Sequence, residues 1–315
     1  MALRRGFKHV VALAGGVGGA KLVEGLAQCL PAGALTVIGN TGDDFRHYGL
    51  HVSPDLDTVM YTLAGLAHPI NGWGIADDTR HMLSMLAHYG EETWFGLGDR
   101  DLATNILRTH WLAQGLPLSA VTARLCQRLG ITSCLLPMTD DPLATVVYTL
   151  EYGRLAFQEY FVRHRWQPTV ERLVYEGAET AQPAAGVLEA LTTAEAIIIC
   201  PSNPLLSIEP ILQVHAIREA IRARRAPCLA VSPIIEGAAL KGPTVKVMRE
   251  LGLRADVAGI SCYYGALIDG LVVDEADREV SIQQRRFVTN IRMITSTDRG
   301  RLAEEVLNMI GDLQP

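Results

Sequence analysis

The sequence HVVALAGGVGGAK at residues 9–21 is the clearest indication of the fold class. Its apolar run at 9–14 predicts a buried strand, and the glycines at 15–19 predict a tight turn that leads into a helix over 20–30. A second apolar run at 35–38 predicts the next strand. A strand–helix–strand unit of this kind joins two parallel strands, so the chain begins as an α/β protein.

The same alternation returns in the second half of the chain. We expect strands at 196–200, 228–232, 271–273 and 292–295, and helices at 208–222, 244–251 and 302–310. Continuous apolar strands between amphipathic helices are typical of a sheet that is covered on both faces. The prediction is therefore a Rossmann-like α/β fold with a mostly parallel sheet and helices on both of its faces.

Residues 70–180 are expected to form an insert within a single α/β domain that spans residues 1–315. The sequence predicts helices at 56–66, 77–89, 101–114 and 118–129, and strands at 135–136 and 144–150. A hairpin around Tyr152 should lead into a strand at 154–161. We expect this helical and hairpin insert to form a lid or subdomain over the sheet.

Composition excludes several classes of function. The net charge is −6, with 28 basic and 34 acidic residues, so no nucleic-acid-binding surface is expected. The six cysteines include no CxxC pair, which favours reduced thiols in a cytoplasmic protein. The apolar stretch near the N-terminus is too short for a signal peptide, and no apolar run is long enough to span a membrane.

The glycine loop, residues 15–19, predicts a phosphate-binding site. Glycines let a phosphate approach the backbone closely, and the helix that follows offers free N–H groups and the positive end of its dipole. The loop is not a dinucleotide fingerprint, because Lys21 occupies the third glycine position, nor a Walker A motif, because Ala20 and Leu22 flank that lysine. The alternative is a turn that only packs the helix against the sheet.

Four carboxylates follow the second strand. Asp43 and Asp44 end the segment NTGDD at 40–44, and Asp55 and Asp57 lie in SPDLDT at 53–58. Ligands bind beyond the carboxyl ends of parallel strands, and Mg²⁺ commonly takes one or two carboxylates together with phosphate oxygens. We expect at least one member of each pair to bind metal, although one aspartate could simply cap a helix.

Three later turns carry further polar groups. In GLGDRDLAT at 96–104, Asp101 is expected to cap a helix while Asp99 and Arg100 face the ligand crevice, or form an exposed ion pair. PSNP at 201–204 and SPII at 232–235 place hydroxyls and amides after successive strands. No histidine has the spacing to another histidine or cysteine that would suggest a zinc site.

Together these segments resemble the 2-phospho-L-lactate transferase family of coenzyme F420 biosynthesis. The motifs that carry the resemblance are GGVGGAK at 15–21, NTGDD at 40–44, SPDLDT at 53–58, WG at 73–74, GLGDRDLAT at 96–104, LPMTDDP at 136–142, PSNP at 201–204, SPII at 232–235 and IDGLVVD at 268–274. No single motif is specific, but their order runs through nearly the whole chain.

The resemblance implies a reaction. Enzymes of this family take a guanosine diphosphate joined through its terminal phosphate to a three-carbon acid. The terminal ribityl hydroxyl of the deazaflavin Fo attacks that phosphate, GMP leaves, and F420-0 or its dehydro form results. The resemblance also implies a requirement for Mg²⁺ and a homodimer. Whether the acid is lactate, enolpyruvate or glycerate stays open.

The resemblance further implies roles for individual residues. The nucleotide would contact Gly15, Gly16, Val17, Gly18, Gly19, Lys21, Ser202, Asn203, Pro204 and Ser232. Mg²⁺ would be held by Asp43 or Asp44 together with Asp57, and Asp57 and Asp44 are the candidate catalytic residues. The Fo side would be lined by Asp57, Gly96, Asp99, Arg100 and Thr104.

Two alternatives remain. A related family with a similar glycine loop binds nucleotide-sugars and regulates cell-wall metabolism, which predicts nucleotide binding without turnover. An NAD(P) dehydrogenase would need an acidic residue at the end of the second strand to hold ribose, and Asn40 stands there instead.

Overall fold

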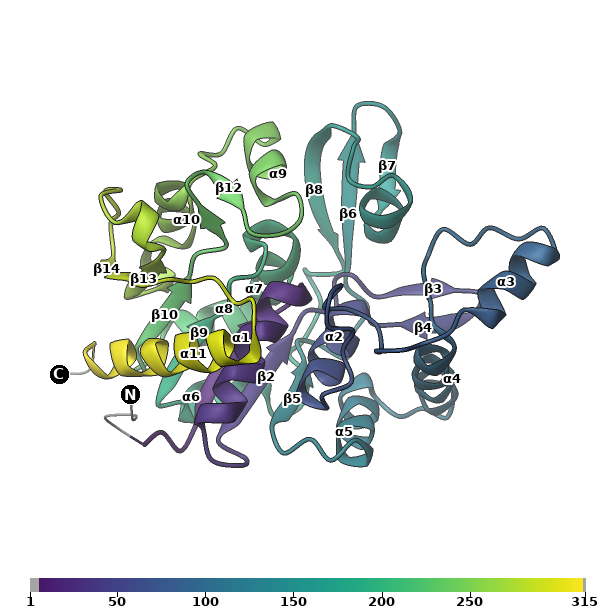
Figure 1. The fold of residues 1–315 in the computed structure, drawn as a ribbon, viewed down its shortest axis with the longest axis horizontal. Helices are drawn as coiled ribbons and strands as arrows, with labels where there is room; N and C mark the ends of the chain where they lie inside the picture. Colours follow the sequence, from purple (N-terminus) through teal and green to yellow (C-terminus); the bar gives the residue numbers. More distant parts are fainter. Residues whose placement is uncertain (1–5, 314–315) are drawn as a thin grey trace.

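A central sheet of seven strands organises the protein, whose computed structural model describes residues 6–313 (Figure 1). The strand order is β14-β13-β10-β9-β1-β2-β5, and every neighbouring pair is parallel. The bounds are β1 Val10–Ala14, β2 Leu35–Gly39, β5 Cys134–Pro137, β9 Ala196–Ile199, β10 Cys228–Val231, β13 Gly270–Val273 and β14 Arg285–Val288. The predicted Rossmann-like fold is confirmed.

Helices cover both faces of this sheet because its strands are apolar on both sides. In β1, Val11 and Leu13 pack into one core, while Val10 and Ala12 pack into the other. The first core includes α6 Val187–Thr193, α7 Glu209–Gln213, α8 His215–Arg222, α9 Thr244–Glu250 and α10 Val257–Tyr264. The second includes α1 Gly16–Cys29, α2 Pro54–Leu63, α4 Asp99–Ala113, α5 Leu118–Arg128 and α11 Ser296–Gly311.

Smaller elements surround the carboxyl edge of the sheet. An antiparallel sheet β7-β6-β8 stands beside it, and the hairpin β3–β4 projects with α3 to one side (Figure 1). The bounds are β3 Phe45–His47, β4 Leu50–Val52, α3 His81–His88, β6 Ala144–Thr149, β7 Gly153–Ala156, β8 Val170–Glu176, β11 Ile234–Ile235 and β12 Ala238–Ala239. Short turns of π- or 3-10 helix lie at Glu159–Arg163, Pro204–Ile208, Gly265–Leu267 and Glu275–Asp277. Within the expected insert, β5 returns to the main sheet beside β2.

Three local predictions are wrong. The strand expected at 292–295 is an irregular segment: Ile291 and Met293 are buried and Ile294 is exposed, which imitates a strand, but no neighbouring strand pairs with it. The expected strand over 154–161 ends at Ala156 and continues as a π-helical turn. The helix expected at 208–222 is interrupted at Val214, which has an extended backbone.

Among the described residues, none of the helices combines the length and the apolar character needed to cross a membrane.

Candidate functional site

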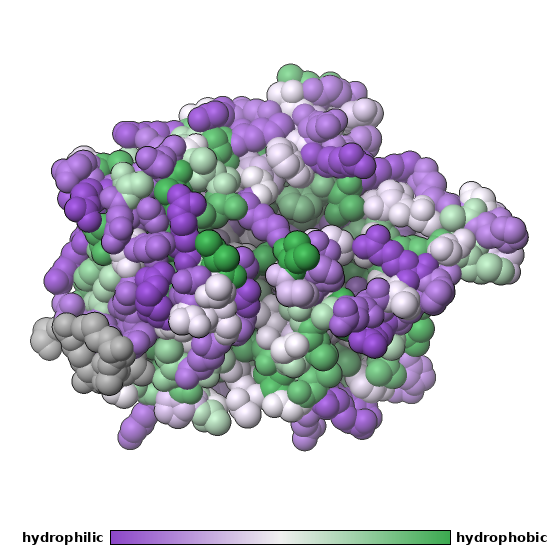
Figure 2. Space-filling view, in the orientation of Figure 1, coloured by the Kyte–Doolittle hydropathy of each residue, from purple (hydrophilic) through white to green (hydrophobic). Residues whose placement is uncertain are grey.

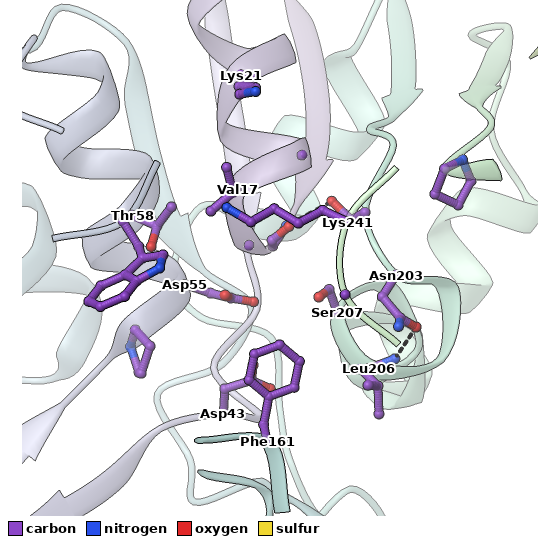
Figure 3. A pocket seen from close by; sticks show the side chains of 18 of the residues that line it. Val17, Lys21, Asp43, Asp55, Thr58, Phe161, Asn203, Leu206, Ser207 and Lys241 are labelled. Carbon is purple, nitrogen blue, oxygen red and sulfur yellow. Dashed lines mark hydrogen bonds between the residues drawn. The ribbon is translucent and has the colours of Figure 1, made fainter. Parts of the chain in front are cut away.

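A cavity of about 590 Å³ lies beyond the carboxyl ends of the central strands, where parallel sheets bind ligands. Its floor comes from the glycine loop after β1, from Asp43 after β2, and from residues 201–203 after β9. Its walls come from segments 157–162 and 240–244, among others. Figure 2 shows apolar side chains in a hollow beneath the β6–β8 sheet, and Figure 3 shows the polar side chains that face the cavity.

Close packing against residues 201–202, in the loop after β9, explains why several positions of the glycine loop are occupied by glycine. The Ser202 hydroxyl accepts a hydrogen bond from the Gly15 N–H at 3.2 Å and donates one to the Gly15 carbonyl at 2.8 Å. A Cβ atom on Gly18 would lie 2.4 Å from the Pro201 carbonyl oxygen, and one on Gly19 would lie 2.5 Å from the Ser202 hydroxyl. These two glycines are therefore required for packing, which was the alternative explanation.

Gly16 is different, because the space beside it is open. It begins α1 with φ of +63°, a conformation that favours glycine, and a Cβ there would meet nothing closer than 3.9 Å. Gly15, Gly16, Val17, Gly18 and Lys21 line the cavity, whereas Gly19 does not.

Asn40 joins two carboxylates on the cavity floor. Its side-chain amide donates to an oxygen of Asp43 and to an oxygen of Asp55, both at 2.9 Å. Burial raises the pKa of Asp55 to about 6, although hydrogen bonds from Asn40 and the Gly16 N–H oppose the rise. Burial and the neighbouring Asp55 raise the pKa of Asp43 well above its usual value. We call Asp43 and Asp55 the carboxylate pair.

The other two aspartates of these motifs have partners within the protein. Arg108 donates to both carboxylate oxygens of Asp57, and the two side chains form a buried ion pair. Burial raises the pKa of Asp57, and the Arg108 guanidinium opposes that rise. Asp44 accepts hydrogen bonds from Ser53 at 2.7 Å and interacts with His51 at 3.0 Å. Asp57 lines the cavity but Asp44 does not.

The carboxylate pair fits a divalent cation such as Mg²⁺. The two buried carboxylates share one amide donor, and burial raises the pKa of both, so a bound cation would stabilise their ionised forms. Across residues 6–313, no three His, Cys, Asp or Glu side chains gather into a metal-binding cluster. Substrate phosphates would therefore have to supply further oxygen ligands.

Asp101 lines the cavity rather than capping a helix, so its expected role as a cap is wrong. Helix α4 begins at Asp99, and Asp101 lies in its first turn. The Tyr61 hydroxyl donates to the Asp101 carboxylate at 2.7 Å, and both residues line the cavity. Burial, followed by the nearby Asp57 charge, raises the pKa of Asp101 to about 7.

The residues expected on the Fo side divide between the cavity and its surroundings. Gly96 lines the cavity, but Asp99, Arg100 and Thr104 do not. Asp99 accepts from the backbone N–H groups of His81 and Met82, which begin α3. Arg100 donates to the carbonyl of Ala76, and Thr104 lies beside the Tyr61 hydroxyl.

Aromatic side chains line the cavity instead. We call Trp73, Phe95, Phe157 and Phe161 the aromatic wall. The WG motif at 73–74 and the aromatic pair before Gly96 were visible in the sequence. Phe157 and Phe161 were not expected at the site, because their segment was predicted to be a strand of a hairpin.

The predicted nucleotide-binding residues of the turns at 201–204 and 232–235 differ in whether they line the cavity. Ser202 and Asn203 line the cavity, but Pro204 and Ser232 do not. The Asn203 side chain accepts from the N–H groups of Leu205 and Leu206, both at 3.0 Å (Figure 3). The Ser232 hydroxyl is satisfied within its own turn, where it donates to the Ile234 carbonyl at 2.9 Å.

A family model for 2-phospho-L-lactate transferase CofD matches residues 10–312. The chain belongs to the CofD family. Phosphoenolpyruvate transferase from Streptomyces coelicolor is 45% identical over 97% of this chain and 99% of its own length. The protein of the same name from Kitasatospora aureofaciens is 49% identical over 85% and 86%, and that from Mycolicibacterium smegmatis is 39% identical over 85% and 88%.

The fold of this CofD-family chain also resembles a crystal structure. A UPF0052 family member from Bacillus halodurans aligns with a TM-score of 0.61 over 95% of this chain and 99% of its own, at 15% identity, which supports the fold alone. The family match and the names of the relatives support a phosphotransferase of coenzyme F420 biosynthesis. In this CofD-family chain, one cavity brings together the start of α1, the carboxylate pair and the aromatic wall.

Proposed function

We propose that this CofD-family protein transfers a phospho-three-carbon-acid group from its guanosine diphosphate conjugate to the terminal ribityl hydroxyl of Fo, with release of GMP. Enolpyruvate is the proposed acid, because relatives 39–49% identical carry the name phosphoenolpyruvate transferase, and the product is then dehydro-F420-0. The observation that carries the proposal is the continuity of the cavity. The glycine loop, the carboxylate pair and the aromatic wall share one space, as a reaction between two bound substrates requires.

The donor is proposed to lie along the glycine loop. The first turn of α1 has backbone N–H groups without helical partners and the positive end of the helix dipole, which together favour a diphosphate. Ser202 and Asn203 lie at the same edge of the cavity and would contact the nucleotide.

The carboxylate pair is proposed to hold Mg²⁺. When bound, the ion would neutralise phosphate charge and help to orient the donor. Asp43 and Asp55 are better placed for this than Asp57, whose carboxylate is paired with Arg108, or Asp44, which does not line the cavity.

The acceptor is proposed to lie against the aromatic wall. A flat deazaflavin ring suits aromatic and apolar neighbours with a few polar groups at its edge. Asp101 and Tyr61 line the same cavity, and Asp101 replaces Asp57 as the candidate to orient the Fo hydroxyl or accept its proton.

The test is product formation by the purified full chain. With Fo, Mg²⁺ and the enolpyruvyl conjugate, mass spectrometry should detect dehydro-F420-0 and an equal amount of GMP. The lactyl and glyceryl conjugates should react more slowly. Binding of GDP without any product or any Fo binding would overturn the proposal and favour the nucleotide-binding regulator. Homodimerisation belongs to the same proposal, and light scattering tests it.

A further inference from the structure

Two ammonium groups face the proposed donor site. The chain has only four lysines, and Lys21 and Lys241 both line the cavity. Lys21 lies on α1, two residues beyond the glycine loop, and Lys241 lies in the segment between β12 and α9. Figure 3 shows Lys241 extended from its own segment toward α1. Two positive charges that are far apart in the sequence therefore lie beside one cavity.

Neither ammonium group is neutralised within the described part of the chain. Lys21 donates to the Met293 carbonyl at 2.9 Å, and Lys241 donates to the Asn71 carbonyl. Neither forms an ion pair with a carboxylate of residues 6–313; Glu24, one turn from Lys21, is paired with Arg299. An ammonium has three donors, so each lysine keeps donors for a ligand.

The two charges also affect each other. Burial lowers the pKa of Lys21, followed by the effect of Arg299. Burial lowers the pKa of Lys241 as well, and Lys21 lowers it further. Like charges held beside a cavity repel one another, and an anion placed between them would relieve that repulsion.

We propose that Lys21 and Lys241 form a receptor for the anionic end of the donor, meaning its terminal phosphoryl group or the carboxylate carried on that group. Lys241 is thereby a specificity-determining residue, and this inference rests on the proposed function for the identity of the donor. The carboxylate pair lines the same cavity, so Mg²⁺ held by that pair and the two ammonium groups would together fix the orientation of a bound diphosphate.

The test compares Lys241→Met with the unmodified chain by calorimetry in the presence of Mg²⁺. The ligands are GMP, GDP, and two esters of GDP on its terminal phosphate, one propyl and one lactyl. Lys241→Met should weaken binding of the lactyl ester about 10-fold or more while GMP binding changes little. A loss confined to the lactyl ester would assign the receptor to the carboxylate, and an equal loss for GDP and both esters would assign it to the terminal phosphoryl group.

Two controls accompany this variant. Lys8→Met removes the same charge at the opposite end of β1, outside the cavity, and should bind all four ligands normally. Lys241→Arg keeps the charge and should retain most of the affinity. Unchanged GDP and ester binding by Lys241→Met would overturn the receptor, and so would equal losses for GMP and GDP. Because these are binding measurements, the receptor can stand even if Fo transfer fails, and transfer can stand if the receptor fails.

Discussion

Arg108 donates hydrogen bonds to both carboxylate oxygens of Asp57, and both side chains are buried. Planar guanidinium and carboxylate groups match each other in this geometry, so Asp57 is occupied by a partner within the protein. The remaining guanidinium nitrogen, Nε, has no hydrogen-bond partner in the described structure. Asp57 therefore differs from Asp43 and Asp55, which line the cavity and form no ion pair with a basic side chain of residues 6–313.

Loss of Arg108 should destabilise the fold. In Arg108→Met the Asp57 charge stays buried without a partner, so we expect the free energy of unfolding at pH 7.5 to fall by about 3–5 kcal/mol. Urea denaturation measures this. The control is Arg222→Met, which breaks an exposed pair with Glu219 and should cost less than about 1 kcal/mol. Equal stability of the two variants would contradict the assignment of Asp57 to a buried ion pair.

The stability of the ligand-free protein should depend on the ionisation of Asp55. Its pKa in the folded state, about 6, lies above the usual value of 3.8. This carboxyl therefore contributes stability that is present below about pH 4 and is lost as the pH rises through about 6. Asp55→Asn stays neutral, so at pH 7.5 it should be more stable than the unmodified chain by on the order of 2 kcal/mol, and at pH 4 the gap should close.

Denaturation at the two pH values, with and without Mg²⁺, measures this effect. Mg²⁺ should raise the unfolding midpoint of the unmodified chain but not that of Asp55→Asn, and Asp55→Asn should lose transferase activity. Glu179→Gln removes an exposed carboxylate and serves as the control. A variant that remains as active and as responsive to Mg²⁺ as the unmodified chain would refute the metal role of Asp55.

A comparison of Gly16→Ala with Gly33→Ala should distinguish an effect on ligand binding from the cost of backbone strain. Gly16 and Gly33 both have positive φ, and alanine at either position should cost about 1–2 kcal/mol of stability. The methyl group at Gly16 would enter the cavity near Asp55 and Ser207, whereas nothing lies within 4 Å of a Cβ on Gly33. Calorimetry should show GDP affinity reduced about 10-fold in Gly16→Ala and unchanged in Gly33→Ala. Similar affinities for both variants would exclude phosphate contact at Gly16.

Affinity for Fo should depend on the aromatic wall. Removing the ring in Phe161→Ala should weaken Fo binding about 10-fold, as fluorescence titration would measure, with GDP affinity nearly unchanged. Trp166→Ala removes a partly exposed aromatic side chain outside the cavity and should leave Fo binding intact. Arg100→Ala should also bind Fo normally, because Arg100 does not line the cavity. Weak Fo binding by Arg100→Ala alone would restore the location expected from the sequence.

Local patterns were sufficient to predict six of the seven strands of the central sheet; β14, Arg285–Val288, was not predicted. Strands such as Val10–Ala14 and Ala196–Ile199 are apolar along their whole length, and the glycine loop marks the start of α1. The predicted strand at 292–295 failed because strand formation also needs a partner, which residue types alone do not reveal. The turn Glu159–Arg163 was missed because π-helical geometry is rare and has no recognised pattern of residue types.

The position of the cavity at the carboxyl edge of the sheet was likewise predictable, but the side chains that line it were not. Asp43 and Asp55 were each one of a pair of candidates. What distinguishes Asp57 from Asp55 is Arg108, which lies 51 residues further along the chain. What distinguishes Asp43 from Asp44 is the direction of each side chain after β2, where Asp44 meets His51 and Ser53. Neither contact can be predicted from the residue types around these aspartates.

The hydrogen bonds between Gly15 and Ser202 have a consequence for how the protein is made. They join loops that are 187 residues apart in the sequence. β1 leads into the first loop and β9 into the second, and these two strands are neighbours in the sheet. A nascent chain that has left the ribosome only as far as residue 190 would possess the glycine loop but not the strand and turn that hold it in place. The capacity to retain nucleotide should therefore arise late in synthesis, so ligand capture by stalled chains of increasing length would report when the sheet closes.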